Sequence, residues 1–335
     1  MKFKLTLEAT KSSKAIHYQD KIMLMGSCFT ENIGAKLHRH LFEVKENPHG
    51  ILFNPISVIG ALQDYMEHKQ YSANDLFELN DLFNSWHHHT RFSDITASAT
   101  LEKINSSISD AHSYLKVADQ LIITLGSAWL YRLTEAAPND AGLVVANNHK
   151  APAQWFEKTL MDPIELSAQL QNIVSKIQSF NHKIQIIFTI SPVRHLREGL
   201  IENNRSKSVL IYAVHDVIAN FKGVEYFPAY EYVIDDLRDY RFYAEDLVHP
   251  NYAATNYVWD KLVSTYFSED TQLIMAEVAE LQLAKQHKPF NKASIAHQAF
   301  LQKSLVKTQV LQSKYPYLPM TDFISFFSGE LINKV

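Results

Sequence analysis

The sequence predicts an α/β protein, with a three-layer α/β/α arrangement around a mostly parallel sheet. Continuous apolar runs of strand length alternate along the chain with segments in which apolar residues recur every three or four positions. Strands that alternate with helices in this way form parallel sheets covered by helices. The runs lack polar alternation, as expected of strands buried on both faces. The pattern stops near residue 267, so we predict an α/β domain over residues 1–267 and a helical extension packed on it over residues 268–335.

The composition limits the class of protein. The 335 residues are 46% apolar, which can fill a large core, and the formal net charge of −4 is not that of a nucleic-acid-binding domain. No apolar run approaches the roughly 18 residues of a membrane span, and the start of the sequence lacks the apolar stretch of a signal peptide. A single cysteine excludes an internal disulfide. We expect a soluble, cytoplasmic protein without nucleic acid or membrane partners, and we make no prediction of its oligomeric state.

The first half of the chain opens the alternation. A short buried strand is predicted at Ile22 to Met25, and the helix after it carries Ile33, Leu37 and Leu41 on one face. Residues 70–100 are predicted to form a long loop over the core, and such loops are frequently functional. The other elements expected before residue 127 are an edge strand, a short strand, two helices and a core strand: Phe3–Leu7, Ile51–Phe53, Ile56–Met66, Leu101–Leu115 and Asp119–Gly126.

The second half continues it after a predicted loop over residues 127–160. Asp162 and Pro163 provide the N-cap and the first-turn proline of the next helix. A strand, a helix, a short strand and a helix then follow: Lys183–Ile190, Ser206–Phe221, Val224–Phe227 and Ala253–Phe267. In the extension, apolar spacing indicates two helices, the first through Ile274, Val278 and Leu281 and the second through Ile295, Ala299, Val306 and Val310.

Small polar residues follow three of the core strands. Ser27 comes after the first, Gly126 and Ser127 after the middle one, and Ser191 after the next. The carboxyl ends of parallel strands meet at one edge of a sheet, and ligands bind there. We therefore expect the functional site at this edge.

The turn Gly26-Ser27-Cys28 has two interpretations. Ser27 can cap the following helix, or it can be a nucleophile held near the backbone N–H groups of a helix start. Cys28 is an alternative nucleophile, because a helix N-terminus lowers the pKa of a thiol, or it is a small buried residue that anchors the helix. Adjacent residues at such a turn point in different directions, so only one of them can face a base. We expect Ser27 to be that residue and Cys28 to be the anchor.

A base for this nucleophile is predicted far downstream, in RFYAEDLVHPN. Asp246 and His249 are three residues apart, which places both side chains on one side of a turn. The carboxylate can then hold the Nδ1–H of the imidazole while Nε2 faces the nucleophile, as in a catalytic triad.

The segment GSCFTENIG resembles the signature of the GSCFA family, a branch similar to the SGNH (GDSL-like) esterases and acyl transferases. Other blocks along most of the chain resemble the family too, among them NPHGILFNP, SWHHHTRFS, VVANNHK and DLVHPN. The resemblance implies a three-layer SGNH-like fold, related in arrangement to flavodoxin, and a catalytic domain. It also implies Ser27 as nucleophile, completed by Asp246 and His249.

The resemblance further implies an oxyanion hole built from two middle blocks. Gly50 or Asn54 is the candidate from the second block. The third block of the wider group has glycine and asparagine, whereas this chain has Gly126 and Ser127 followed by alanine. Ser127, or a residue of the FNSWHHHT loop such as His89, is expected to replace the missing asparagine.

Other polar clusters give weaker signals. Arg194, with His195 and Arg197 near it, follows a core strand and could bind an anionic group of the substrate or lie in a solvated loop. The triplet of residues 87–89 invites a zinc hypothesis, but further ligands with suitable spacing are missing, and we expect no metal site. The common nucleotide-binding glycine motifs are absent from the sequence, and we expect no cofactor.

Together these observations predict a serine hydrolase or acyl transferase that acts on an ester, such as an O-acyl group on a carbohydrate. The substrate would be a small molecule or a carbohydrate ester. The alternative, motivated by the missing asparagine, is a binding or scaffold protein that keeps the fold without the hydrolysis.

Overall fold

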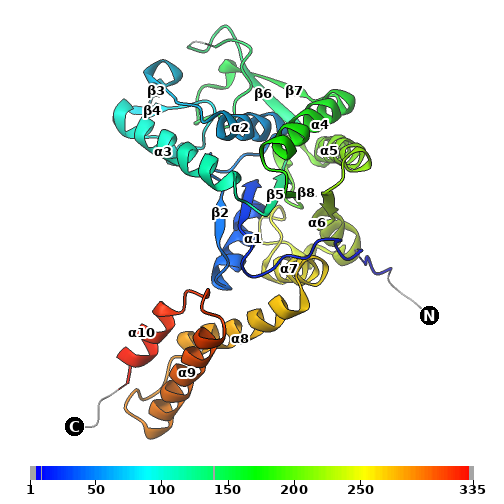
Figure 1. Cartoon of the computed structure of the whole chain (residues 1–335). Helices are drawn as coiled ribbons and strands as arrows, with labels where there is room; N and C mark the ends of the chain where they lie inside the picture. Colours follow the sequence, from blue (N-terminus) through cyan, green and yellow to red (C-terminus); the bar gives the residue numbers. More distant parts are fainter. Residues whose placement is uncertain (1–4, 9, 139, 332–335) are drawn as a thin grey trace.

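The computed structural model of the chain describes residues 5–8, 10–138 and 140–331. Its centre is a five-stranded parallel sheet in which the strands lie in the order β2 (Val44–Glu46), β1 (Ile22–Gly26), β5 (Gln120–Leu125), β8 (Gln185–Ile190) and β9 (Val224–Phe227) (Figure 1). The four predicted core strands are confirmed as β1, β5, β8 and β9. The predicted α/β/α class with a helical extension is confirmed as well.

Helices cover both faces of the sheet because successive strand residues point to opposite sides. Met23 and Met25 of β1 belong to one hydrophobic cluster, together with α2 (Pro55–Glu67), α3 (Ala97–Leu115), α4 (Pro163–Phe180) and α5 (Leu200–Asn220). Ile22 and Leu24 belong to a second cluster with α1 (Cys28–Arg39) and α7 (Tyr252–Tyr266). A strand that is apolar on both faces thus connects two cores, which is why β1 reads as a continuous apolar run.

The carboxyl ends of the strands meet at one edge. Gly26 pairs in register with Thr124 of β5, and Leu125 pairs with Ile190 of β8. If the five strands are numbered by their order along the chain, they lie across the sheet in the order 2-1-3-4-5. The next strand after β1 is therefore added at one edge of the sheet, and the next strand after β5 is added at the other. Such a switch point is where ligands bind in open α/β sheets, and the β1–α1 junction is located there.

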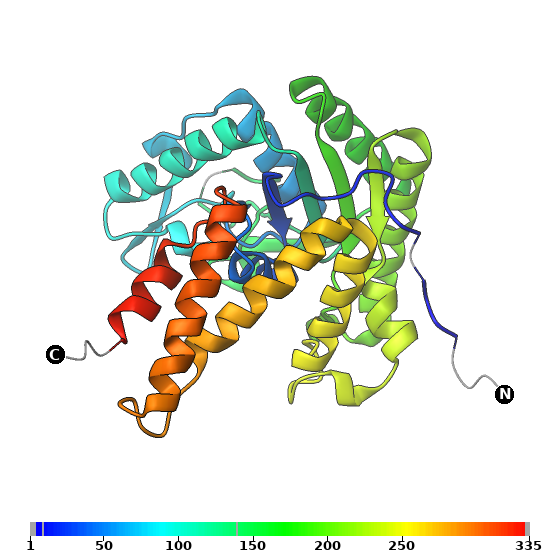
Figure 2. The ribbon, with the colours of Figure 1, turned by 60° about the horizontal axis from the view of Figure 1, so that its bottom comes forward.

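Three helices form the C-terminal region: α8 (Glu269–Gln286), α9 (Ile295–Lys314) and α10 (Thr321–Gly329). They lie on the side of the domain that carries α1 and α7 (Figures 1 and 2), and they share its hydrophobic cluster. The second predicted helix exists, but its buried residues include Leu301, Leu305 and Leu311, whereas the predicted apolar residues Ile295, Val306 and Val310 are exposed. The predicted domain boundary falls between α7 and α8 and stays a prediction.

Several other differences involve short or edge elements. The segment Ile51–Phe53 is not a strand, residues 5–7 form none, and Phe3 lies outside the described residues. The edge strand beside β1 is β2, whose three half-buried residues include two charges and gave no apolar signal. The predicted loop over residues 70–100 contains an antiparallel pair of strands and two short turns: β3 (Phe77–Leu79), β4 (Leu82–Asn84), η1 (Ala73–Asp75) and η2 (Thr90–Phe92). The predicted loop over residues 127–160 contains a second antiparallel pair and one turn: β6 (Trp129–Leu133), β7 (Phe156–Leu160) and η3 (Ala153–Trp155). The remaining short elements are η4 (Leu196–Glu198) after β8 and, after β9, α6 (Ala229–Glu231), η5 (Tyr232–Leu237) and η6 (Tyr240–Phe242).

Among the described residues, no helix combines the length and the apolar character needed to cross a membrane.

Candidate active site

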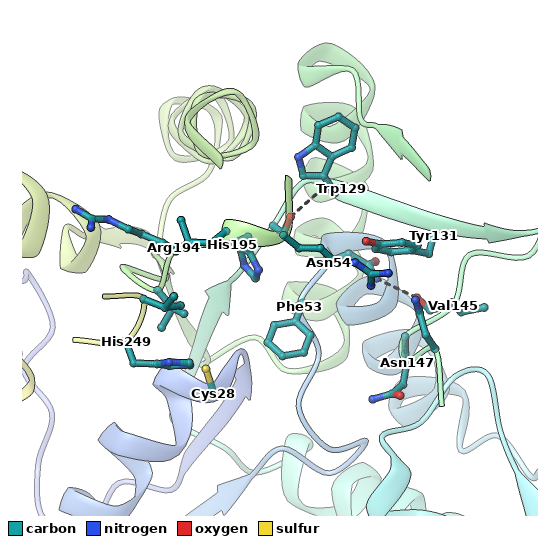
Figure 3. Close-up of a pocket in the computed structure, with 17 residues that line it drawn as sticks. Cys28, Phe53, Asn54, Trp129, Tyr131, Val145, Asn147, Arg194, His195 and His249 are labelled. Carbon is teal, nitrogen blue, oxygen red and sulfur yellow. Dashed lines mark hydrogen bonds between the residues drawn. The ribbon is translucent and has the colours of Figure 1, made fainter. Parts of the chain in front are cut away.

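A cavity of about 600 Å³ opens at the carboxyl edge of the sheet (Figure 3). Six segments that are far apart in the sequence contribute to its wall. The residues that line it include Cys28, Phe53, Asn54, Ser127, Trp129, Tyr131, Asn147, Asn148, Arg194, His195, Arg197 and His249. The wall therefore combines a thiol, an imidazole, amides and aromatic rings. The site is at the edge of the sheet that the sequence predicted.

The predicted contact between Asp246 and His249 forms. His249 Nδ1 lies 2.6 Å from Asp246 Oδ2 and, because a carboxylate only accepts, Nδ1 carries the proton. Asp246 Oδ1 also accepts from the backbone N–H groups of His249 and Val248, at 3.0 and 2.9 Å. These hydrogen bonds lower the pKa of Asp246 to about 2, and the bond from the backbone N–H of His249 has the largest effect. The ionised carboxylate thus fixes the tautomer of His249 and leaves Nε2 for chemistry.

Ser27 and Cys28 do not take the positions that we expected. Ser27 is buried, with 1% of its surface exposed, and its Oγ accepts from Phe29 N at 3.3 Å as the N-cap of α1. Ser27 is not among the residues that line the cavity, whereas Cys28 is. In Figure 3 the sulfur of Cys28 and the ring of His249 point toward one another. The thiol of Cys28 and the imidazole of His249 thus line one cavity, and Ser27 does not line it.

The surroundings of Cys28 act on its thiol in opposite directions. Partial burial and the nearby carboxylate of Glu31 raise the pKa of the thiol, while the backbone N–H groups of Cys28 and Phe29 and the ammonium of Lys207 lower it. Burial is the largest influence, and the net pKa lies above the ordinary value. A thiol of this kind is protonated at neutral pH, so a neighbouring base has to accept its proton before it can attack.

Two of the expected oxyanion residues lie in the cavity wall. Asn54 caps α2 through Oδ1, which accepts from Ser57 N at 2.8 Å, and its Nδ2 donates to Val145 O at 3.2 Å. The amide has a second N–H that this contact does not use. The hydroxyl of Ser127 lies 3.2 Å from Ser206 Oγ. Both side chains can present a hydrogen-bond donor to a bound group.

The other expected oxyanion residues lie elsewhere. The N–H of Gly126 donates to Phe53 O at 2.9 Å, so it is not available to a substrate, and Gly126 does not line the cavity. Gly50 and His89 pack against each other outside the cavity wall. Gly50 has φ of +84°, and a Cβ there would lie 2.2 Å from His89 Cβ. The positive φ and the close approach of His89 leave no room for a side chain at position 50, so Gly50 has a structural role in the loop.

Arg194 supports the loop that carries His249. Its backbone N–H donates to Val248 O at 3.2 Å, and its guanidinium lies 4.0 Å from the ring centroid of Tyr243. In Figure 3 its side chain points away from Cys28 and Asn54. The ring of His195 instead packs edge-on against Phe53, with centroids 6.0 Å apart. The charge of Arg194 is thus engaged with the protein.

Several lining residues carried no signal that we used. Trp129 and Tyr131 belong to the unpredicted strand β6, and Asn147 lies in the block VVANNHK, to which the sequence assigned no role. At the β1–α1 junction, the capping interpretation of Ser27 describes its hydrogen bond, because serine is a preferred N-cap residue. A serine that caps a helix turns its hydroxyl back onto the helix, and the next residue is then free to face outward.

The histidine triplet does not gather around one point. The imidazole of His88 is buried with Nδ1 3.0 Å from Ser85 Oγ, and His89 accepts through Nδ1 from Arg91 N at 3.3 Å. Within the described ranges, no three histidine, cysteine, aspartate or glutamate side chains are arranged to hold a metal ion.

Comparison with known proteins identifies relatives at the level of a family. A model described as the GSCFA family matches residues 21–262, and a second, described as the C-terminal domain of GSCFA domain proteins, matches residues 278–333. A search of curated proteins gives no significant match.

Solved structures with similar folds include two esterases. A family 3 carbohydrate esterase of Clostridium thermocellum is 10% identical with a TM-score of 0.33, over 77% of this chain and 98% of that one. An acetyl xylan esterase from the rumen bacterium Butyrivibrio proteoclasticus is 11% identical with a TM-score of 0.38, over 74% of this chain and 63% of that one. Likenesses of this degree do not establish an activity for this chain.

Proposed function

This chain belongs to the GSCFA family, and we propose that it is an acyl-transfer enzyme, a hydrolase or acyltransferase that acts on esters. Cys28 is the nucleophile in this proposal, His249 is its general base, and Asp246 orients the base. The choice of Cys28 replaces Ser27, the nucleophile that the sequence favoured.

One observation carries the proposal. A thiol and an imidazole line the same cavity, and a carboxylate holds the far nitrogen of the imidazole at 2.6 Å. This is the arrangement by which an activated nucleophile is recognised: a nucleophile, a base and a group that orients the base. Ser27 lacks such access because its hydroxyl is buried against Phe29 N.

The reaction follows from these groups. Nε2 of His249 accepts the thiol proton while Cys28 Sγ bonds to the ester carbonyl carbon, and the carbonyl oxygen becomes an oxyanion. The oxyanion then collapses, the bond to the ester oxygen breaks, and His249 returns the proton to the leaving alcohol. The product is a thioester on Cys28. Water or an acceptor hydroxyl attacks this thioester, again with His249 as base, and releases the acyl group and the free thiol.

The oxyanion needs donors on the side of the carbonyl away from His249. The N–H of Cys28 is one of the first N–H groups of α1, which have no partner within a helix, and the positive end of the helix dipole favours an anion there. Asn54 Nδ2 and the Ser127 hydroxyl line the same cavity. We propose that these three groups form the oxyanion hole, and removal of one such donor typically lowers the rate by about 10²–10³.

The rest of the wall suits a ligand that is rich in hydroxyl groups. Trp129 and Tyr131 offer aromatic faces, and Asn147 and Asn148 offer amides that can both donate and accept. We therefore propose O-acyl groups on a carbohydrate as the substrate class. Acetylated and deacetylated oligosaccharides test this class directly.

The experiment compares alanine variants of the two adjacent candidates. Hydrolysis of p-nitrophenyl acetate is measured for wild type, Cys28→Ala and Ser27→Ala, and Cys28→Ala should lose at least about 10²-fold in kcat/KM, as expected for loss of a nucleophile and its base-assisted step. Ser27→Ala should keep its activity at temperatures where it is folded, because loss of an N-cap costs only about 0.5–2 kcal/mol of stability.

Two outcomes contradict the proposal. Loss of activity in Ser27→Ala with activity retained in Cys28→Ala would return the role of nucleophile to Ser27. Hydrolysis no faster than the uncatalysed reaction in wild type and in both variants would leave the binding or scaffold protein as the correct interpretation.

A further inference from the structure

A lysine is buried beside the candidate site, and the reaction proposed above does not use it. Lys207 lies on α5 with 1% of its surface exposed. Its Nζ donates to the carbonyl oxygens of Gly126 and Ser191, at 2.6 and 2.7 Å. These residues directly follow β5 and β8, so the ammonium lies where the two strands end at the edge of the cavity.

The charge of this lysine is not matched by a fixed counter-charge in the part of the chain that the structure describes. Over the described residues, no carboxylate forms a salt bridge with Lys207. The ring of Tyr230 is 5.9 Å from Nζ, and the two carbonyls supply only partial negative charge. An ammonium that is buried without an ionic partner is costly, and complete burial lowers the pKa of Lys207 to about 7.

Among the described residues, the ionisable group that acts on the charge of Lys207 is the thiol of Cys28. A thiolate there raises the pKa of the lysine, and the ammonium in turn lowers the pKa of the thiol. The other groups that face Cys28 are Glu31, which opposes its ionisation, and His249, which lines the cavity with it. The fold accounts for this proximity, because β1 ends beside β5: Ser27 N donates to Thr124 O at 3.2 Å, and Lys207 binds Gly126 O two residues further on.

We propose that Lys207 is a positioning residue that supplies a buried positive charge to the anion formed at Cys28 during acyl transfer. This inference rests on the proposed role of Cys28 as nucleophile. In the resting site the ammonium of Lys207 lacks an ionic partner among the described residues. The reaction forms a negative charge at Cys28, and this charge is the partner. Stabilisation that is stronger for the anion than for the thiol lowers the barrier of the step that forms it.

The side chain of Lys207 also has a structural role, and the experiment has to separate this role from the electrostatic one. The ammonium ties the end of β5 to the end of β8 by its two hydrogen bonds, so its loss could act on the site through the backbone alone. Lys207→Gln removes the charge and keeps two N–H donors for the carbonyls, whereas Lys207→Met removes both. An effect of charge is common to the two variants, and an effect of the strut is confined to Lys207→Met.

The measurement uses the fact that Cys28 is the only cysteine in the chain. The rate of alkylation by iodoacetamide, followed against pH, reports the ionisation of this one thiol without any need for a substrate. At about pH 6, where Lys207 carries its charge, we expect the alkylation rate in Lys207→Gln and in Lys207→Met to be roughly tenfold lower than in wild type, as for loss of a nearby opposite charge. Lys176→Met, which removes a charge from the exposed surface of α4, is the control and should leave this rate unchanged.

The inference fails if Lys207→Gln is alkylated at about pH 6 as fast as wild type, because the role of the lysine would then be structural. This result is separate from the test of the proposed function. Loss of turnover in Cys28→Ala together with an unchanged alkylation rate in Lys207→Gln would support the enzyme and reject the electrostatic role of Lys207.

A second measurement needs no change at Lys207, in case its variants do not fold. Wild-type protein alkylated with iodoacetate carries a carboxylate on Cys28, and protein alkylated with iodoacetamide carries a neutral amide of nearly the same size. NMR of isotope-labelled lysines should show one lysine that titrates near pH 7, and its midpoint should be roughly one pH unit higher in the carboxylate form. Equal midpoints in the two forms would reject the proposed electrostatic contact.

Discussion

Two histidine–carboxylate pairs among the described residues are joined by hydrogen bonds, and they differ in what surrounds them. His249 and Asp246 are about half exposed, at 52% and 48% of their side-chain surfaces, and only Nδ1 of the imidazole is held. His49 and Asp64 are buried, and both nitrogens of His49 are occupied. Nε2 is 3.1 Å from Asp64 Oδ2, and Nδ1 is 2.8 Å from the Tyr65 hydroxyl.

The comparison shows that the pairing of an imidazole with a carboxylate does not by itself make a base. His49 donates to Asp64 and accepts from Tyr65, and His88 stacks on its ring at 4.1 Å, so no nitrogen remains for a substrate. This pair stabilises the loop that holds Gly50. In the exposed pair one nitrogen is held and the other faces a cavity, which is the condition for proton transfer.

The largest effect that sharpens this contrast is expected at the exposed pair. His249→Ala should lower kcat/KM for p-nitrophenyl acetate by about 10²–10⁴, because general-base assistance is lost. Its stability should change little, because the side chain is half exposed and its one hydrogen bond lies at the surface. Steady-state kinetics and urea denaturation of the same preparation measure both quantities. A large loss of stability in this variant would make the exposed pair structural and remove the contrast.

The buried pair should show the opposite behaviour. His49→Leu fills a similar volume but leaves the Tyr65 hydroxyl and Asp64 without one partner each, at a cost of about 1–3 kcal/mol in the free energy of unfolding. Turnover per folded molecule should be close to that of wild type, since His49 does not line the cavity. Denaturant titration and active-site titration check the two parts. A stable variant without activity would place His49 in the catalytic machinery and overturn the comparison.

The two pairs also differ in how far the sequence could predict them. Asp246 and His249 are three residues apart within one turn, so local geometry was enough to predict their contact. His49 and Asp64 are 15 residues apart, on a loop and on α2, and their contact depends on how α2 packs. The same distinction holds for the sheet: long apolar strands such as β5 were predicted, whereas β2 and the hairpin of β6 and β7 form through pairings that leave little local pattern.

Which residue of the β1–α1 junction lines the cavity is a local question. The family resemblance drew attention to Ser27, but the direction of each side chain at the β1–α1 junction is set by capping. Ser27 Oγ turns back to Phe29 N, and Cys28 occupies the first position of α1 at the cavity. The oxyanion residues depend on tertiary contacts instead: the hydrogen bonds of Gly126 with Phe53 and of Ser127 with Ser206 join segments that only the fold brings together.

The smallest effect that we predict concerns acid and the buried histidines. Burial lowers the pKa of His49, and it lowers the pKa of His149 to about 4. In the unfolded chain these groups return to a pKa of about 6.5. The unfolded state therefore binds protons below about pH 6.5 that the folded state does not bind, so stability is complete above this pH and is lost as the pH falls toward 4. Each histidine should lower the free energy of unfolding by on the order of 1 kcal/mol between about pH 6.5 and 5.5.

The exposed pair keeps its carboxylate over the same interval, because the pKa of Asp246 is lowered to about 2. Urea denaturation at about pH 7, 6.5 and 5.5, for wild type and His49→Leu, isolates the share of the buried pair. The variant is less stable at pH 7 but should lose less of its remaining stability on acidification, since one of the groups that protonate on unfolding is gone. Equal slopes for the two proteins would mean that His49 takes up its proton in the folded state. The buried imidazole would then be able to exchange protons, and the property that separates it from His249 would be lost.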